Sequence, residues 1–365
     1  MISKNEWSDK LKSLKDDISS KVIENSEFAK QRVVDLLEHG LPPAQSDALL
    51  ASFNGIVGDH LLQRNSRFAI PMVFTDHTQH LSDEPEELEA QLPEASSRIV
   101  LCVHGWCMAD KGWIRKGHDH GKQFLNAGYS AIYLWYNTGN HISLNGEEFA
   151  YRLEKLLQAW PCEVKELVII GHSMGGLVTR SACYYAGLNQ LQWLNVLRTF
   201  ITLGTPHNGA PLAKVACWID EQVSGTPQLK FLKKLGEIRS SGSKDLSRGY
   251  IVHEDWQVPD IPVKQPDQDK AVGTALIQRP TLPDSVQCYA IASCLGKNIE
   301  DENNRRLGDG LVPVASALAN SSKGVLALNY PDDHKWVVGG VDHLDLLNHP
   351  AVAAKVSEWV LKHTV

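Results

Sequence analysis

Residues 167–178 have the sequence LVIIGHSMGGLV, which places a serine between an apolar strand and a helix. The four apolar residues before Gly171 are typical of a buried strand, and the residues after Gly176 are compatible with a helix. Residues 171–175 fit the pattern G-x-S-x-G, whose glycines allow the sharp turn that exposes a nucleophilic serine. In a chain of this length, the pattern alone arises by chance roughly one time in ten, as an ordinary glycine turn. Its place between a strand and a helix favours Ser173 as a nucleophile.

Short apolar segments alternate with helical patterns along most of the chain. The predicted strands cover residues 68–74, 99–104, 130–136, 167–171, 199–204 and 286–292, with a further strand at 325–328. The predicted helices cover residues 5–38, 147–160 and 351–363, and one more begins at residue 176. The segment 81–97 is rich in acidic residues, which indicates an exposed connection. Because the strands are short and apolar on both faces, the pattern predicts an α/β fold with a mostly parallel central sheet flanked by helices.

Two segments depart from this regular pattern. The first, residues 1–60, is predicted to be an N-terminal helical extension, and residues 61–365 are predicted to form the main domain. Apolar residues recur at helical spacing within residues 5–38, so we expect this helix to pack on the main domain or to join two copies of the chain. A membrane-surface helix is the alternative, which the acidic residues weaken. Residues 211–285 separate two strands by far more than a simple crossover, and we predict a helical lid there.

Composition excludes several classes of protein. The 365 residues include 36 basic and 43 acidic side chains, a formal charge of −7, with 43% hydrophobic residues. These values are ordinary for a soluble globular protein and exclude collagen, a disordered chain and a disulfide miniprotein. The mild acidity argues against nucleic acid or an anionic membrane as the main partner. No window approaches about 18 uninterrupted apolar residues, and residues 1–14 lack the apolar core of a secretory signal, so we expect a cytoplasmic protein.

Neither the cysteines nor the histidines predict a metal or cofactor site. The seven cysteines form no CxxC pair, and several lie in apolar runs, which favours buried free thiols in a reducing compartment. The only dense histidine cluster is His118-Asp119-His120, which has no recognisable third ligand and indicates a solvated loop. The sequence contains no phosphate-binding loop and no dinucleotide fingerprint. We therefore expect no metal and no cofactor.

A serine hydroxyl is a poor nucleophile without a base, and an acid must orient that base. On a strand–turn–helix of this kind, the acid and the histidine follow the serine in the chain. Asp309 lies in GDGLVP, residues 308–313, where the glycines allow a tight turn that points the carboxylate inward. Alone, this Asp-Gly pair would indicate only a turn. The competing acids lack such glycine neighbours: Asp284, Asp301, Asp332 and Asp333.

The base is expected among the histidines that follow Asp309. These are His334, His343, His349 and His363. His343 comes after a flexible loop, residues 339–342, that can bring its imidazole over Ser173. The other three lie in a charged turn, at a helix start and in the terminal helix. We therefore favour His343 as the general base and Asp309 as the acid that orients it.

The reaction also needs N–H donors for an oxyanion. One is expected from Met174, the residue after the nucleophile. The other is expected from Trp106, because Gly105 lets the backbone turn in the loop after the 99–104 strand. His104, in the same loop, has the expected structural role of bonding its own loop. We place four residues at the substrate site: His104, Gly105, His172 and Leu203.

With these residues identified, the chain resembles α/β-hydrolases of the lipase and esterase group over about residues 98–363. The motifs that carry the resemblance are HGW at 104–106, GHSMGG at 171–176, TLGTPHNGA at 202–210, GDGLVP at 308–313 and VDHLDLL at 341–347. In addition, YNTGNHIS at 136–143 is similar to bacterial relatives grouped with GPI-inositol-deacylase-like hydrolases. The resemblance implies the α/β-hydrolase fold, a triad of Ser173, Asp309 and His343, and no cofactor. It leaves open the direction of the large Trp106 indole.

The expected function is that of a serine carboxylester hydrolase, an esterase or lipase that forms an acyl-enzyme on Ser173. The expected substrate is a small-molecule or lipid ester, with transient contact to a lipid interface. Aromatic residues within 211–285 favour a hydrophobic acyl site under the lid: Trp218, Phe231 and Trp256. An acyltransferase or thioesterase would use the same triad and is the first alternative. A non-catalytic binding protein on a hydrolase fold is the second.

Overall fold

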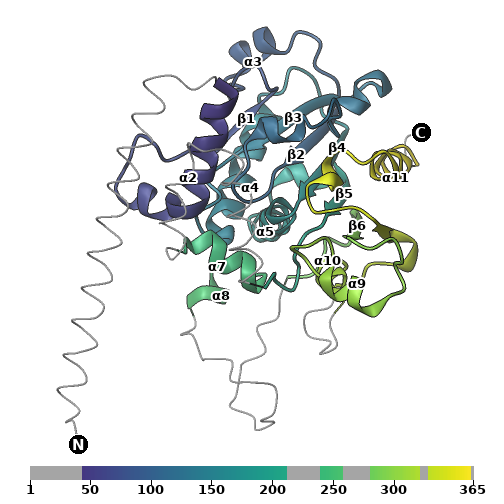
Figure 1. The fold of residues 1–365 in the computed structure, drawn as a ribbon. Coiled ribbons are helices and arrows are strands. Elements are labelled where there is room, and N and C mark those ends of the chain that lie inside the picture. The colour runs from purple at the N-terminus through teal and green to yellow at the C-terminus, as the bar shows by residue number, and fades with distance from the viewer. Residues whose placement is uncertain (1–42, 212–238, 258–279, 321–327, 363–365) are drawn as a thin grey trace, which may run out of the picture.

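The computed structural model describes residues 43–211, 239–257, 280–320 and 328–362 (Figure 1). Seven strands form one sheet in the order β1-β3-β2-β4-β5-β6-β7. The edge strand β1 runs antiparallel to β3, and the other neighbouring strands are parallel. The strands are β1 (Val73–Thr75), β2 (Arg98–Val103), β3 (Ser130–Trp135), β4 (Glu166–His172), β5 (Leu197–Leu203), β6 (Gln287–Cys294) and β7 (Lys335–Gly339).

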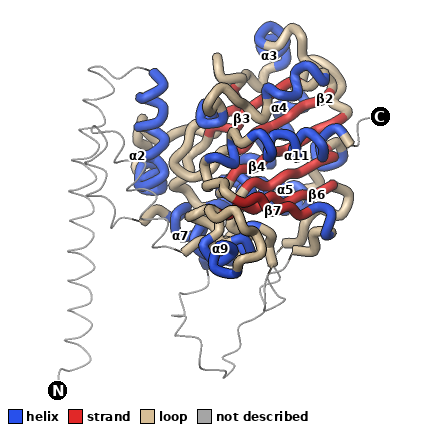
Figure 2. Tube along the Cα trace, turned by 45° about the vertical axis from the view of Figure 1, so that its right-hand side comes forward, coloured by secondary structure: helices blue, strands red, loops and turns tan. Residues whose placement is uncertain are grey.

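Helices flank the sheet on both sides (Figure 2). The α-helices of the described residues are α2 (Pro43–Gln63), α3 (Pro85–Gln91), α4 (Ile142–Gln158), α5 (Met174–Leu188), α7 (Ser241–Arg248), α8 (Glu254–Gln257), α9 (Glu302–Leu307), α10 (Val314–Ala317) and α11 (Pro350–Leu361). Short 3₁₀ helices are η1 (Asp110–Trp113), η2 (Lys122–Ala127), η3 (Gln192–Asn195), η5 (Asp332–His334) and η6 (Asp345–Leu347). No helix among these residues is both long and apolar enough to cross a membrane.

The core has two layers because alternate residues of a strand face opposite sides of the sheet. In β2, Leu101 packs in a cluster that contains Leu153 of α4 and Leu177 of α5. Its neighbour Cys102 packs in a second cluster that contains Val356 of α11. Both faces of the central strands are therefore buried, which explains why these strands are continuous apolar runs in the sequence.

The structure confirms the predicted parallel sheet flanked by helices, with three local differences. The sequence predicts a strand over 68–74, whereas β1 covers only Val73–Thr75. The edge strand β7 is not predicted, because four of its five residues are only partly buried and no apolar run marks it. The segment 81–97 was expected to be only a connection, but it contains α3, which is held by the single buried residue Leu88.

Several sequence-based expectations lie outside the described residues. They concern the helix at 5–38, most of the lid at 211–285, and residues 325–327 of the last predicted strand. Within the predicted lid, residues 239–257 are described and contain α7 and α8. Helix α7 packs against α2, which extends past the predicted domain boundary at residue 60. The Ser241 N–H and hydroxyl both donate to Asp59 Oδ2 of α2, at 2.8 and 2.9 Å.

A buried polar cluster joins the turn after β1 to the segment between β2 and β3. His77 Nε2 lies 3.0 Å from Asp119 Oδ2, and His77 Nδ1 lies 3.5 Å from Asp110 Oδ2. Thr75 donates to Asp110 at 2.6 Å, and Tyr133 donates to Asp119 at 2.7 Å. Burial alone would lower the pKa of His77, but hydrogen bonds to the two aspartates raise it above its ordinary value. Burial alone would raise the pKa of both aspartates. Hydrogen bonds, first of all the one from His77, have the opposite effect, and the pKa of each aspartate is lowered to about 2. The imidazole thus lies between two carboxylates, which favour its protonated form.

We predict that His77→Gln costs more stability in acid than in alkali. A histidine whose folded-state pKa is raised stabilises the fold fully below its unfolded pKa of about 6.5. This contribution is lost as the pH rises through the folded-state pKa. The difference in unfolding free energy between wild type and His77→Gln, measured with urea, should therefore be largest below about pH 6.5 and shrink as the pH rises through the folded-state pKa. The exposed His80 provides the control variant, His80→Gln. A difference that stays constant with pH would contradict the charged link.

Candidate active site

Ser173 lies in the turn between β4 and α5, with φ 53° and ψ −122°. A non-glycine residue in this left-handed region is uncommon and strained. Close packing enforces the turn: a Cβ on Gly171 would lie 2.7 Å from the Cα of Gly176, and a Cβ on Gly175 would lie 2.1 Å from the carbonyl oxygen of Val103. Only glycines allow β2, β4 and α5 to come this close. The serine is thereby fixed at the carboxyl end of β4 and at the start of a helix.

Asp309 and His343 form a buried hydrogen bond of 2.7 Å between Asp309 Oδ2 and His343 Nδ1. The second carboxylate oxygen, Oδ1, accepts from the N–H groups of Leu311 and Val312, at 3.0 and 2.7 Å. The glycines on either side of Asp309 have positive φ values of 62° and 97°, which only glycine adopts easily. The N–H of His343 also donates to the Asp309 carbonyl oxygen at 3.1 Å. Both the acid and the histidine are therefore fixed in orientation.

Backbone contacts bring Ser173 and His343 to the same edge of the sheet. The Ser173 N–H donates to the carbonyl oxygen of Leu203, the last residue of β5, at 2.9 Å. Gly204 follows directly, and a Cβ on this residue would lie 3.2 Å from His343 Nδ1. On the other side of the serine, His172 Nε2 donates to the His343 carbonyl oxygen at 3.0 Å. The predicted nucleophile thus has the predicted Asp–His pair as its neighbour at the carboxyl ends of β4, β5 and β6.

The two expected oxyanion donors flank the serine. Met174 is the first residue of α5, where helical N–H groups lack a partner within the helix. The loop after β2 lies against the serine, because a Cβ on Gly105 would lie 3.0 Å from the Cβ of Ser173. The structure also settles the direction of the Trp106 indole, which is buried and donates from Nε1 to the Gly55 carbonyl oxygen of α2 at 2.9 Å. The indole is part of the core.

Two residues that contact this loop, Thr138 and Gly55, could not be assigned to the site from the sequence. The Cys107 N–H donates to Thr138 Oγ1 at 3.1 Å, and Gly55 accepts from the indole next to it. Thr138 lies in the YNTGNHIS motif, which the sequence marks without assigning a role. Nothing in the sequence near Gly55 points to the site. Both contacts join parts of the chain that are far apart in sequence.

The other residues that we expected at the substrate site have buried side chains or none. His104 Nδ1 lies 2.9 Å from the Gly105 carbonyl oxygen, and burial lowers the pKa of His104 to about 4. Burial and the neighbouring His343 hold the pKa of His172 well below its ordinary value. The Leu203 side chain packs in the cluster that contains α11. Both imidazoles are therefore neutral and make structural hydrogen bonds. A substrate contact by His104, Gly105, His172 or Leu203 remains a prediction.

The His118–His120 segment is not the solvated loop that its sequence indicates. His120 is fully buried, and its Nε2 lies 3.0 Å from the Leu346 carbonyl oxygen. His118 Nε2 lies 3.3 Å from His120 Nδ1. That prediction is wrong because the tether to residue 346 draws the ring into the core. Among the described residues, no group of three or more histidine, cysteine or acidic side chains is arranged to hold a metal ion.

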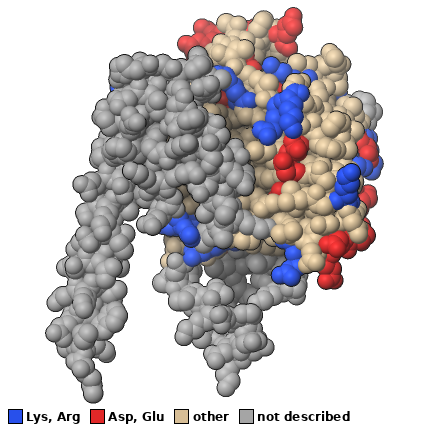
Figure 3. All heavy atoms as spheres, in the orientation of Figure 1, with Lys and Arg blue, Asp and Glu red and all other residues tan. Residues whose placement is uncertain are grey.

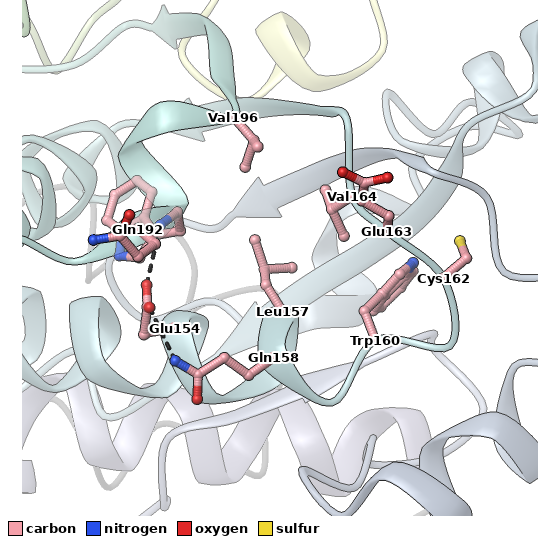
Figure 4. A pocket seen from close by; sticks show the side chains of 10 residues that line it. Glu154, Leu157, Gln158, Trp160, Cys162, Glu163, Val164, Gln192 and Val196 are labelled. Atoms are coloured by element: carbon pink, nitrogen blue, oxygen red, sulfur yellow. Dashed lines mark hydrogen bonds between the residues drawn. The ribbon is translucent and has the colours of Figure 1, made fainter.

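One surface pocket lies at the edge of the sheet opposite Ser173 (Figure 4). Its lining includes Glu154 and Leu157 of α4, Val164 before β4, and Trp193 and Val196 before β5. These residues are near the amino ends of β4 and β5, whereas the serine follows the carboxyl end of β4. Ligands of parallel α/β sheets bind at the carboxyl ends of the strands. This pocket is therefore not the candidate active site.

A more open hollow lies near the carboxyl ends of the strands. Its lining comes from the loop after β5, the end of α7 and the region of α10, and includes Asn208, Arg248, Pro313 and Ser316. The described part of the face in Figure 3 carries basic and acidic side chains side by side. That part of the surface therefore presents no extended field of one sign.

Comparison with known proteins gives one family match and several similar folds. The profile of the PGAP1-like alpha/beta domain matches residues 147–288. No curated protein sequence matches the chain. The lipase BlEst2 of Bacillus licheniformis, in its mature form, is 17% identical, covers 80% of this chain and 96% of its own, and has a TM-score of 0.45. The esterase Pf2001 of Pyrococcus furiosus is 15% identical, with coverages of 74% and 82% and a TM-score of 0.40.

A thioesterase is also among the similar structures. RedJ from the prodiginine biosynthetic pathway of Streptomyces coelicolor is 13% identical, with coverages of 73% and 91% and a TM-score of 0.41.

The fold itself follows from the chain's own topology. A mostly parallel sheet with an antiparallel strand β1 at its edge carries a strained serine after β4, and an Asp–His pair follows later in the chain. The protein therefore has the α/β-hydrolase fold.

Proposed function

We propose that this protein is a serine carboxylester hydrolase, an esterase or lipase. The observation that carries the proposal is the 2.7 Å hydrogen bond between Asp309 Oδ2 and His343 Nδ1, at the sheet edge where Ser173 follows β4. A carboxylate only accepts, so this bond keeps the imidazole proton on Nδ1. Nε2 of His343 is then the basic nitrogen for the serine proton.

In the proposed acylation, Ser173 Oγ attacks the ester carbonyl carbon while His343 Nε2 takes the hydroxyl proton. Asp309 stabilises the imidazolium that forms. The negative oxygen of the tetrahedral intermediate accepts hydrogen bonds from the N–H groups of Met174 and Trp106. The positive end of the α5 dipole adds to this stabilisation. The intermediate collapses when His343 returns the proton to the departing alcohol, which leaves an acyl group on Ser173.

Deacylation repeats these steps with water as the nucleophile. His343 Nε2 takes a proton from water, and the resulting hydroxide attacks the acyl carbon. The same two N–H groups hold the second oxyanion. The intermediate collapses and releases the carboxylic acid, while His343 Nε2 returns the proton to Ser173 Oγ. No step uses a cofactor, because the nucleophile, the base and the oxyanion donors are all groups of this chain.

We predict that Ser173→Ala lowers kcat for p-nitrophenyl butyrate by about 10⁴-fold or more, because the acyl-enzyme cannot form. Labelling by a fluorophosphonate probe should be lost at the same time. Ser293→Ala is the matched control, since it removes another buried serine hydroxyl, that of a residue in β6. Full turnover by folded Ser173→Ala protein would contradict the proposed mechanism.

We also predict that Asp309→Asn lowers kcat by about 10⁴-fold with little change in KM. An amide at this position can donate to His343 Nδ1, which favours the tautomer whose Nε2 carries the proton and is not basic. Asp301→Asn is the control, because Asp301 is a rival acid in the sequence and caps α9 from the exposed loop nearby. Equal losses in kcat for the two variants would argue against Asp309 as the orienting acid.

A further inference from the structure

The loop that carries the proposed Trp106 donor is a tight turn with an unusual residue in it. The Met108 N–H donates to the Gly105 carbonyl oxygen at 3.3 Å, which closes a turn over residues 105–108. Cys107, the third residue of the turn, has a φ of 59°. A positive φ at this position is typical of a type II turn, which favours glycine or asparagine there. A cysteine adopts this conformation only when its surroundings hold it.

Thr138 supplies the contact that fixes the orientation of this turn. Its Oγ1 accepts from the Cys107 N–H at 3.1 Å, and the threonine is 2% exposed. Type I and type II turns differ by a rotation of the central peptide plane, here the plane between Trp106 and Cys107. This plane contains the Trp106 carbonyl and the Cys107 N–H, so the hydroxyl fixes the backbone directly after the Trp106 N–H, which itself belongs to the preceding peptide plane. Without this acceptor, the Cys107 N–H would favour a rotated plane.

The loop around Thr138 is itself firmly attached. The Asn137 side chain accepts from the Gly139 N–H and donates to the Gly58 carbonyl oxygen of α2, both at 3.0 Å. Asn145 of α4 donates to the Asn137 carbonyl oxygen at 2.9 Å. Three bonds thus anchor the residues on either side of the threonine. Its hydroxyl is consequently presented to Cys107 from a rigid support.

Helix α2 holds the other side of the same turn. Val57 has φ −133° and ψ 15°, which are not helical, so α2 is kinked there (Figure 1). Such a kink interrupts the helical hydrogen-bond ladder. The nearby Gly55 carbonyl oxygen accepts from Trp106 Nε1 at 2.9 Å and from Ser240 Oγ at 2.7 Å. A Cβ on Gly55 would lie 2.2 Å from Cys107 Sγ, so the helix backbone rests directly against the turn.

We propose that Thr138 is a positioning residue for the oxyanion site: its hydroxyl holds the 105–108 turn so that the Trp106 N–H faces the carbonyl attacked by Ser173. The proposal rests on the proposed function. Thr138 does not touch the substrate; it acts through Cys107. Its hydroxyl should matter more in the transition state than in substrate binding, because the oxyanion forms only as the bond to Ser173 forms.

The test compares Thr138→Val with Thr138→Ser. Valine has nearly the shape of threonine but no hydroxyl, whereas serine keeps the hydroxyl. With p-nitrophenyl butyrate, Thr138→Val should lower kcat by about 10- to 100-fold with KM nearly unchanged, less than the loss of about 10²–10³ for removal of a donor. Thr138→Ser should restore most of the rate. Thr78→Val is the control, since it removes a threonine hydroxyl bond in an exposed turn.

A second measurement does not depend on turnover. Backbone hydrogen–deuterium exchange of the peptide over residues 104–108 should be faster in Thr138→Val than in wild type or Thr138→Ser, while a peptide from α11 stays unchanged. If Thr138→Val does not fold properly, Thr138→Ala replaces it, because alanine also lacks the hydroxyl and adds no bulk. The same faster exchange is then expected.

The outcomes separate the two proposals. A wild-type kcat in folded Thr138→Val and Thr138→Ala would overturn the positioning role, whether or not exchange becomes faster. Equal loss of kcat in the valine and serine variants would also overturn it. If the wild-type protein shows no ester turnover, or turnover that does not require Ser173, the proposed function is overturned instead. The exchange comparison would still decide whether Thr138 holds the turn.

Discussion

The close packing of β2, β4 and α5 is the constraint on which the candidate active site depends. A methyl group on any of Gly171, Gly175 or Gly176 would lie less than 3 Å from neighbouring atoms, at 2.7, 2.1 and 2.1 Å. Since no side chain fits, the chain passes from strand to helix in a single residue, and Ser173 takes a strained backbone conformation. The buried strands on either side keep it there. The packed sheet thus holds Ser173 in this strained conformation.

His343 shows how the rest of the edge is organised around this turn. Its ring is held through Nδ1 by Asp309, its N–H by the Asp309 backbone, and its carbonyl oxygen by His172. His172 is also the residue directly before the serine. Ser173 and His343 therefore share a support of buried hydrogen bonds, to which the Asp309 carboxylate and the neutral His172 ring both contribute. In the proposed reaction, such a support needs little rearrangement when charge develops on the imidazole.

The sequence predicts the central strands well because both of their faces are buried, so that each is an apolar run. It fails at β7, since its partly exposed residues leave no such run. Chain order left four histidines and several acids, among which the flexible loop favoured His343 and the glycine neighbours favoured Asp309. The structure pairs these two residues. The contacts of Thr138 and Gly55 could not be predicted in this way. They are single hydrogen bonds between residues 31 and 51 positions apart, and no local pattern encodes them.

The shared carbonyl oxygen of Gly55 has a consequence for the evolution of the chain. Trp106 and Ser240 both donate to it, so it joins α2, the turn after β2 and the segment before α7. Inserting or deleting one residue in the helical turn before Gly55 would rotate that part of α2 by about 100° and carry this acceptor away from both donors. Length changes in the first half of α2 should therefore be rare among functional descendants.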